Sequence, residues 1–443
     1  MTRFSRYLRT RESGPWTALF HELHPEPWHV PTSTWQQLHA AEALPPAALA
    51  ELAQRGLLAG PAEDDAVLAR AQAELSTRLD RASVLYLVLV QSCNFSCSYC
   101  PIPELARETG DQLMTPATAR AAVDLWAAHI RDDYSEGAEY CAILYGGEPL
   151  LNESALTAAV EYIEHLQAAG ALPPQALTIM VCTNGTLINR RTAAYFHEHG
   201  ISVAVGCDGP AEAHDAVRRD TAGKATFAQV EMAIRVLVNE GVTTFASASI
   251  TPHNLLLIEN FSAFFAGLGI AKFGFNFLRG RLLFRLLPEE QLTDYYERAT
   301  DGVLANFERS GGRHLEYQVE RKHLALLEHR YFPTDCNGYG NQLVIEPSGQ
   351  VGNCPFIRAD MADVHDSGFR IRTQPIVQRW RTRLPLNNPA CAPCDAKAIC
   401  GAGCAWNAQE LKGDPLALDD AMCLLTRKIF NRLLWADLPA GSP

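Results

Sequence analysis

Ten of the thirteen cysteines stand in ordered groups whose spacing could bind metal. The first group, Cys93-x3-Cys97-x2-Cys100, lies in the stretch QSCNFSCSYCPIP, directly after the apolar run SVLYLVLV. A structural zinc site needs four ligands, and no fourth cysteine or histidine is close to this group. Three thiolates can instead hold a 4Fe–4S cluster and leave one iron open to another ligand. The other seven grouped cysteines are Cys336, Cys354, Cys391, Cys394, Cys400, Cys404 and Cys423.

Length and composition set the context for this chemistry. A chain of 443 residues, 47% hydrophobic, is expected to fold into two or three globular domains. The formal net charge of -12 argues against a nucleic-acid partner. We find no apolar run with the pattern of a signal peptide or the length of a membrane span, so we expect a cytoplasmic protein. In that reducing compartment thirteen cysteines indicate metal binding rather than disulfides, and Cys141, Cys182 and Cys207, each single in an apolar strand, are interpreted as small buried hydrophobes.

Residues 84 to about 280 alternate β-branched runs with amphipathic stretches, which is the pattern of βα units and a parallel sheet. Six strands are too few for a closed eight-stranded barrel and predict an α/β fold with a partial (β/α)6 barrel. The expected strands are 84–91, 139–145, 176–182, 202–207, 243–250 and 271–277. The expected helices are 116–131, 154–169, 190–199, 225–240 and 254–267.

Distinctive loops follow the first four strands, where parallel β/α folds bind ligands. After the cysteine loop come GGEPLL (146–151), TNGTL (183–187) and DGP (208–210), the last followed by HDAVRR. Each of the last three alone is an ordinary turn signal. Four such loops at one rim predict a ligand site there.

Segments of different character flank the barrel, which we place at 83–288. Residues 1–82 predict a winged-helix-like unit with a strand pair, two short helices and a strand at LLAG. It is either a packing appendage or a peptide-recognition unit. Residues 289–332 predict two bridging helices, 289–309 and 314–330, and 333–443 form a cysteine-rich domain.

The three-cysteine loop after the first strand resembles that of the radical S-adenosylmethionine (SAM) superfamily. The resemblance implies that the cluster binds SAM and that reductive cleavage gives a 5′-deoxyadenosyl radical, which abstracts a substrate hydrogen. It implies that Glu148 accepts a hydrogen bond from the SAM amino group. Asn184 and Arg218 would lie near the methionyl end, and Cys207 or Ser249 near the ribose. The full set of implied SAM-site residues is Tyr99, Gly146, Gly147, Glu148, Pro149, Asn184, Cys207, Arg218 and Ser249.

The later cysteines, with Gly349, resemble the seven-cysteine SPASM pattern of radical SAM maturases. That resemblance implies two auxiliary 4Fe–4S clusters, and so three clusters in all. The proximal one would lack a fourth thiolate, and its fourth site would be open or filled by Asp335 or by substrate. The proximal set is Cys336, Cys354 and Cys404, and the distal set is Cys391, Cys394, Cys400 and Cys423.

Within that group the chain is similar to enzymes that mature ribosomally synthesised peptides. The implied reaction is an oxidative cross-link, carbon–carbon, ether or thioether, in a precursor peptide whose leader binds the N-terminal unit as an added strand. An external electron donor of flavodoxin or ferredoxin type is implied as well. Sulfatase maturases commonly carry Asp after the equivalent of Cys354, where this chain has Pro355. We identify no catalytic base.

Three alternatives stay open. The chain could be a radical SAM enzyme that acts on a folded protein or a small molecule, a zinc-binding interaction protein without activity, or an electron carrier that never cleaves SAM. A basic stretch, RIRTQPIVQRWRTR, is either a solvated surface or the receiver of an acidic leader.

Overall fold

The structure is a computed structural model of the 443-residue chain. Predicted positions 271 and 314–316, and the outermost residues of both terminal domains, lie outside the residues that it describes. The described residues are 4–40, 44–102, 112–134, 137–174, 176–270, 272–311, 317–332, 334–357 and 360–436.

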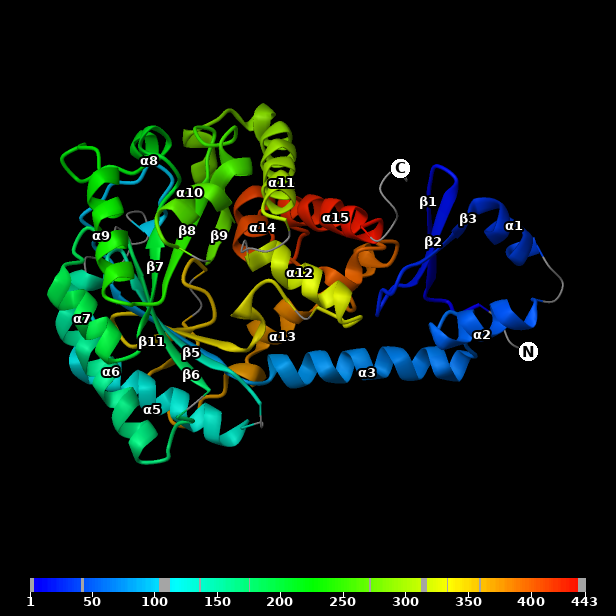
Figure 1. The fold of residues 1–443 in the computed structure, drawn as a ribbon. Helices are drawn as coiled ribbons and strands as arrows, with labels where there is room; N and C mark the ends of the chain where they lie inside the picture. Colours follow the sequence, from blue (N-terminus) through cyan, green and yellow to red (C-terminus); the bar gives the residue numbers. More distant parts are fainter. Residues whose placement is uncertain are drawn as a thin grey trace.

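The centre of the molecule is a nine-stranded sheet, mostly parallel, in the order β12-β11-β10-β4-β5-β6-β7-β8-β9 (Figure 1). Its six consecutive strands β4 to β9 are parallel to one another, and each coincides with a predicted strand to within about two residues. The prediction of six parallel strands in an α/β fold is therefore confirmed. Their bounds are β4 Val84–Val90, β5 Tyr140–Gly146, β6 Leu177–Thr183, β7 Ser202–Gly206, β8 Thr244–Ile250 and β9 Lys272–Phe277.

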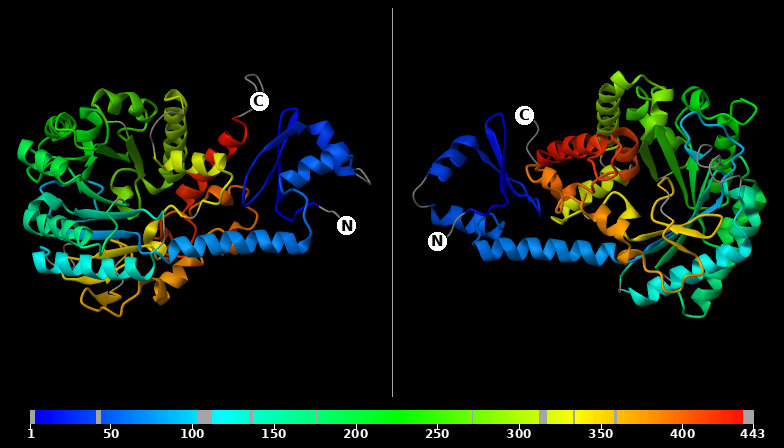
Figure 2. Two further views of the ribbon diagram at one scale, coloured as in Figure 1. Left: turned by 60° about the horizontal axis from the view of Figure 1, so that its bottom comes forward. Right: turned by 180° about the vertical axis from the view of Figure 1, so that it is seen from behind.

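Helices cover the outer face of this sheet (Figures 1 and 2). In α5 the buried residues Ala119, Ala122, Val123 and Trp126 recur every three or four positions, so one stripe of the helix faces the sheet. Pro116 at the first position and Thr115 at the N-cap, which accepts from the amide of Thr118, start that helix. The helices are α5 Pro116–Asp132, α6 Glu153–Ala168, α7 Arg190–Glu198, α8 Ala211–Val217, α9 Phe227–Asn239 and α10 Phe261–Gly267.

These helices confirm the predicted ones, with two differences. Residues 254–267 do not form one helix, because a 3-10 turn at Ile258–Asn260 precedes the short α10. The helix α8 was not predicted. Its seven residues are too few to show a periodic pattern, yet they position a cluster of polar side chains described below.

Three strands of the cysteine-rich region extend the sheet beyond β4, which the sequence analysis did not predict. The strand β10 pairs parallel to β4, with Gln342 opposite Val84. The strands β11 and β12 then continue antiparallel. The barrel and the proximal cysteines are therefore built on one continuous sheet, because Cys336 and Cys354 flank β10 and β11. The bounds are β10 Gln342–Ile345, β11 Gln350–Gly352 and β12 Ala362–Asp363.

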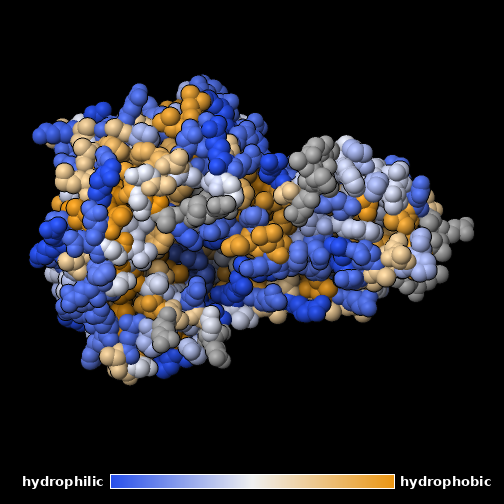
Figure 3. Space-filling view, viewed as in Figure 1, coloured by the Kyte–Doolittle hydropathy of each residue, from blue (hydrophilic) through white to orange (hydrophobic). Residues whose placement is uncertain are grey.

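The two predicted bridging helices are α11 (Leu292–Arg309) and α12 (Tyr317–Leu327). The second lies beside the outer strand β9, where the side-chain amide of Gln318 donates to the carbonyl of Phe275 at 2.9 Å. A helix thus covers this edge, which would otherwise expose backbone groups. Hydrophilic residues border a hollow beside α12 on this face of the molecule (Figure 3).

The N-terminal residues form a three-stranded antiparallel sheet, β1 (Leu8–Ser13), β2 (Trp16–His21) and β3 (Trp28–Pro31), with helices beside it. The segment LLAG is not a strand, since only Leu58 forms a bridge, to Phe4. A 19-residue helix, α3, then runs from this unit to the barrel (Figure 1). The helices are α1 Thr32–Ala40, α2 Pro46–Gln54 and α3 Pro61–Leu79.

The N-terminal unit contacts the cysteine-rich region through a buried ion pair. Lys397 Nζ lies 2.8 Å from a carboxylate oxygen of Glu22, and their side chains are 8% and 3% exposed. Phe20 packs edge-on against Phe430 of α15, and His29 Nε2 lies 2.7 Å from the carbonyl of Leu434. The remaining helices of this region are α13 Pro375–Arg381, α14 Ala405–Lys412 and α15 Asp420–Leu434.

Among the helices that the structure describes, none has the length and apolar character needed to cross a bilayer.

Candidate functional site

The loop that carries the first three cysteines lies against the backbone of GGEP. The amide of Gly147 donates to the carbonyl of Val90 at 2.8 Å, and the amide of Glu148 donates to Ser92 at 3.0 Å. A side chain on Gly146 or Gly147 would overlap the backbone of Val90 or Ser92. Glycine is therefore needed here because two backbones touch, at the carboxyl ends of β4 and β5.

The carboxylate of Glu148 joins the GGEP loop to the loop after β6. It is fully buried and accepts hydrogen bonds from the hydroxyl of Thr183 (2.7 Å), the amide of Asn184 (2.8 Å) and the amide of Leu150 (3.1 Å). Burial raises the pKa of this carboxyl to about 7, although the three hydrogen bonds act in the opposite direction and lower it. The side chain is thus occupied by protein donors in this structure. Pro149 begins the 3-10 turn Pro149–Asn152 that follows.

Asn184 connects the third loop to the first. Its side-chain amide donates to the side-chain oxygen (Oδ1) of Asn94 at 2.7 Å and lies 3.7 Å from the sulfur of Cys93. Its own oxygen accepts from the amide and hydroxyl of Thr186. The predicted residue Asn184 is therefore at the three-cysteine loop, as expected for a rim residue.

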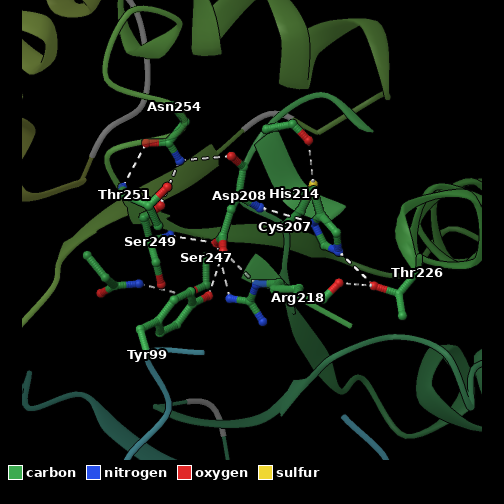
Figure 4. Close-up of polar contacts among 12 residues, drawn as sticks. Tyr99, Cys207, Asp208, His214, Arg218, Thr226, Ser247, Ser249, Thr251 and Asn254 are labelled. Atoms are coloured by element: carbon green, nitrogen blue, oxygen red, sulfur yellow. Dashed lines mark hydrogen bonds and ion pairs between the residues drawn. The ribbon is translucent and has the colours of Figure 1, made fainter. Parts of the chain in front are cut away.

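Asp208 is the centre of the fourth loop, and the sequence analysis treated it only as part of a turn (Figure 4). Its side chain is 0% exposed and takes a two-pronged ion pair from Arg218, at 2.8 and 3.1 Å. It also accepts from the hydroxyl of Tyr99 at 2.5 Å and from the amide of Ser249 at 2.8 Å. One carboxylate therefore holds together the cysteine loop, β8 and the segment after α8. The sequence feature that could have predicted this ion pair is an Asp directly after a strand and ten residues before an Arg.

Arg218 lies inside the rim. Its guanidinium is only 13% exposed, lies over the ring of Tyr99 and is paired with Asp208. It therefore has a structural partner, and its contact with the SAM carboxylate stays a prediction. Its guanidinium also packs against Gly206, where a Cβ would collide with it.

A second layer of polar groups supports Asp208. The amide of Asp208 donates to His214 Nδ1 at 3.3 Å, and His214 Nε2 lies 3.2 Å from the hydroxyl of Thr226. Asn254 donates to the carbonyls of Asp208 and Ser249 at 2.9 and 2.8 Å. Burial lowers the pKa of His214 to about 4, so this ring is neutral near pH 7 and can accept at Nδ1. The ring of His214 thus lies within the hydrogen-bond network that supports Asp208.

Cys207 and Ser249 have different surroundings. Cys207 is fully buried in the main hydrophobic core, and its thiol lies 3.6 Å from the carbonyl of Gly209. It therefore has no accessible surface in this structure, and the core packing does not support its predicted contact with the SAM ribose. The strand β7 ends at Gly206, so strand alternation no longer fixes which way residue 207 points. Ser249 lies at the rim beside Asp208.

The grouped cysteines lie together in three sets. The thiols of Cys93, Cys97 and Cys100 interact with one another, and burial raises the pKa of the first two to about 11 and about 12. A buried thiol must lose its proton to bind a metal, so metal binding is coupled to proton release here. The second set is Cys336, Cys354 and Cys404, and the third is Cys391, Cys394, Cys400 and Cys423.

The third set surrounds a small cavity. All four thiols line one cavity of about 90 Å³, together with Pro385, Leu418, Lys397 and Arg427. Within the described residues, no three Cys, His, Asp or Glu side chains converge closely enough for a single metal ion. Four thiols around a wider cavity with cationic neighbours fit a polynuclear, negatively charged cluster.

The second set has three thiols, and Asp335 lies near it in a buried ion pair. Both carboxylate oxygens of Asp335 are within 3.1 Å of Nζ of Lys322, a lysine with no exposed side-chain surface. Asp335 also acts on Cys400 of the third set. The fourth ligand of the proximal set, open or filled by Asp335 or by substrate, stays a prediction.

The other cysteines and the basic stretch are mostly accounted for by the fold. Cys141 and Cys182 are half-buried, not fully buried as predicted, because they alternate with the core residues of β5 and β6. Four arginines of the basic stretch have partners in the protein, which argues against a leader-binding surface. The pairs are Arg370 with Asp132, Arg372 with Asp133, Arg381 with Asp80 and Arg383 with the hydroxyl of Tyr339.

Comparison with known proteins gives three results. Residues 87–260 match the model of the Radical SAM superfamily. The serine-type anaerobic sulfatase-maturating enzyme of Bacteroides thetaiotaomicron is 27% identical over 179 residues, which cover 39% of this chain and 40% of that enzyme. The serine-type enzyme of Klebsiella aerogenes is 24% identical over 333 residues, 71% of this chain and 77% of the relative.

The fold of the chain is similar to the solved structure of native anSMEcpe with bound AdoMet and Cp18Cys peptide. The TM-score is 0.63 at 20% identity, and the match covers 80% of this chain and 98% of that one. The match to the first of the two relatives spans about two fifths of that relative's length. With the superfamily match covering β4 to β8 and the three-thiol loop at their carboxyl ends, residues 87–260 form a domain of the Radical SAM superfamily.

Proposed function

We propose that the chain is a radical SAM maturase that oxidatively installs a cross-link in a ribosomally synthesised precursor peptide. The observation that carries the proposal is the presence of two further thiol sets outside the radical SAM domain, at 336–404 and 391–423. Cys336, Cys354 and Cys404 would hold the proximal auxiliary cluster, and the four thiols of the distal cavity would hold the other.

The electron balance explains why two extra clusters suit this reaction. When bound, SAM and its cluster supply a 5′-deoxyadenosyl radical that takes one hydrogen atom from the substrate. The substrate radical and a nucleophilic group X–H then give the R–X bond, one proton and one electron. The auxiliary clusters provide an acceptor for that electron.

The protein's own residues prepare the site for this chemistry. Cys93, Cys97 and Cys100 would hold the SAM cluster, and the GGEP backbone with Asn184 would orient SAM beside it. Asp208 and Glu148 fix the loops in place, because each buried carboxylate is saturated by donors from neighbouring loops. Such fixed, buried polar groups keep the rim rigid and limit the access of water.

The N-terminal sheet supports the assignment of a peptide substrate. Within the described residues, β1 and β3 each pair with β2 only, so the sheet has two outer edges. An extended leader could add to one of them as a strand. The sheet is bound to the distal cysteine segment by Glu22 and Lys397, so a leader held there would lie near the cluster region.

Sulfatase maturation is the second candidate, because the curated relatives are sulfatase-maturating enzymes. Such an enzyme needs a base near the substrate. Cys354 is followed here by Pro355, which has no side chain able to take a proton. The same buried rim would serve either reaction.

The test starts with anaerobically purified protein. We expect about twelve irons per chain, from three four-iron clusters, and 5′-deoxyadenosine after addition of dithionite and SAM. Cys97→Ala should abolish that product, whereas Cys141→Ala, a thiol outside the three sets, should not. Mass spectrometry of a co-produced small peptide encoded beside the gene should show a loss of two hydrogens. Zinc in place of iron, or clusters without SAM cleavage, would contradict the proposal.

A further inference from the structure

Two arginines act on the proximal thiol Cys336, and only one of them is used by the fold. Arg383 is 2% exposed, and its guanidinium donates to the hydroxyl of Tyr339 at 2.7 Å and to the carbonyls of Ala402 and Ala417. Those bonds show that Arg383 has a structural role in this region. Arg279 makes no comparable bonds to the described residues.

Arg279 stands at the carboxyl end of β9, the edge of the sheet where parallel β/α folds bind ligands. It is half-buried. Within the described part of the chain, its guanidinium donates no hydrogen bond and forms no ion pair. A half-buried guanidinium without a partner in the described protein is available to pair with an anion that the polypeptide does not supply.

The neighbouring backbone holds Arg279 beside the proximal set. The amide of Gly280 donates to the side-chain oxygen of Asn407 at 2.8 Å, and Arg281 Nε donates to the carbonyl of Glu410 at 2.9 Å. Both acceptors are in α14, the helix that begins directly after Cys404. The loop after β9 is therefore fastened to the helix that carries this ligand.

The groups around Arg279 identify the anion. The acidic groups that act on its charge are Cys404, Asp419, Tyr317 and Cys336. Asp419 is itself occupied, since it accepts from the amide of Cys404 at 2.8 Å and from Asn407 at 2.9 Å. Besides the phenol of Tyr317, the two thiols remain, and they become thiolates when a cluster is bound.

We propose that Arg279 is the charge partner of the proximal cluster and raises its reduction potential. The inference rests on the proposed assignment of Cys336, Cys354 and Cys404 as ligands of that cluster. Three thiolates give the oxidised cluster a net negative charge, and reduction adds another. A fixed cation favours the reduced form because it offsets that additional charge. Arg279 is thus a positioning residue that makes the proximal cluster a better electron acceptor.

The experiment is an EPR-monitored redox titration of the holoprotein in a background without the SAM cluster, Cys93→Ala/Cys97→Ala/Cys100→Ala. Two auxiliary potentials should then be seen. In Arg279→Gln one of them should shift to a more negative value. At a fixed solution potential, the ratio of reduced to oxidised proximal cluster should fall at least tenfold. This corresponds to a shift of the reduction potential by about 59 mV for one electron.

Matched variants separate charge from structure. Arg279→Lys keeps the cation and should keep most of the potential, and Arg285→Gln, which removes an exposed cation at the end of the turn Arg281–Arg285, should leave both potentials unchanged. If Arg279→Gln loses about four irons while Arg279→Lys retains all, the charge is needed even for assembly and the inference stands. Unchanged potentials in Arg279→Gln at full iron content, or loss of the cluster in both Arg279 variants, would overturn it. A parent protein without iron would instead refute the proposed function itself.

Discussion

The barrel rim and the cysteine-rich region both present thiols, but they are built differently. At the rim, Glu148 and Asp208 are saturated by donors from three neighbouring loops. In the cysteine-rich region, four thiols surround a cavity of about 90 Å³ that the polypeptide does not fill. Hydrogen bonds between protein groups hold the first region, whereas in the second the thiols surround a space that no protein group occupies.

This difference indicates how each region depends on its cofactor. A site whose polar groups satisfy one another can keep its shape without a ligand. A cavity lined by thiols gains much of its stability from the metal centre itself, as small metal domains do. We therefore expect the rim to be folded before cluster insertion and the segment 389–436 to become ordered with its cluster.

The largest effect is expected from removing a distal thiol. Cys400→Ala should lower the iron content by about four per chain, because a distal cluster would lose one of its ligands. Hydrogen exchange should rise sharply in α15 and at 389–400, and stay unchanged in β5 to β7. Cys141→Ala is the control, being a half-buried thiol outside the sets. Equal changes in the barrel and in α15 would contradict the difference between the regions.

The second-largest effect is expected from replacing Asp208, whose carboxylate accepts hydrogen bonds from several segments of the rim. Asp208→Asn leaves Arg218 as an unpaired charge with 13% exposure, so we expect a loss of about 3–5 kcal/mol in the free energy of unfolding. Urea unfolding of the apo protein measures it. Glu153→Gln breaks an ion pair with Arg191 whose side chains are 67% and 76% exposed, and should cost no more than about 1 kcal/mol. Similar losses for both variants would show that Asp208 does not hold the rim.

The third effect is a pH dependence of the free energy of unfolding, caused by His214 beside Asp208. The pKa of His214 is lowered by burial from 6.5 to about 4, so the folded protein binds fewer protons than the unfolded chain between these values. Stability from this group is complete above pH 6.5 and is lost as the pH falls toward 4, by about 3 kcal/mol.

The variant His214→Gln should flatten that part of the stability curve, measured by urea unfolding from pH 7 to pH 4. His365→Gln replaces an exposed histidine and serves as the control. A curve for His214→Gln as steep as that of the parent would contradict the assignment.

The sequence predicted the six parallel strands and their ligand-bearing loops because each strand is a local pattern of apolar residues. It did not predict β10, since the four residues 342–345 become a strand only by pairing with Val84–Leu87, far away in the chain. It missed α3, whose 19 residues bury only four side chains and so show no clear apolar stripe. The sequence also did not predict the ion-pair partners of Arg218 and Asp335, because the tertiary fold determines which charged side chains meet.

The smallest effect is expected at the ion pair between Glu22 and Lys397, which connects the N-terminal sheet to the distal cysteine segment. Lys397→Met removes one partner of Glu22, but Arg9 still pairs with that carboxylate, so we expect a loss of about 1–3 kcal/mol. Limited proteolysis should then release the N-terminal unit, with cleavage in α3, sooner than in the parent. The double variant Glu22→Gln/Lys397→Met should lose less than the sum of the single variants, because the pair is broken only once. Additive losses would mean that the two charges do not stabilise each other and that the sheet is held by its apolar contacts with α15.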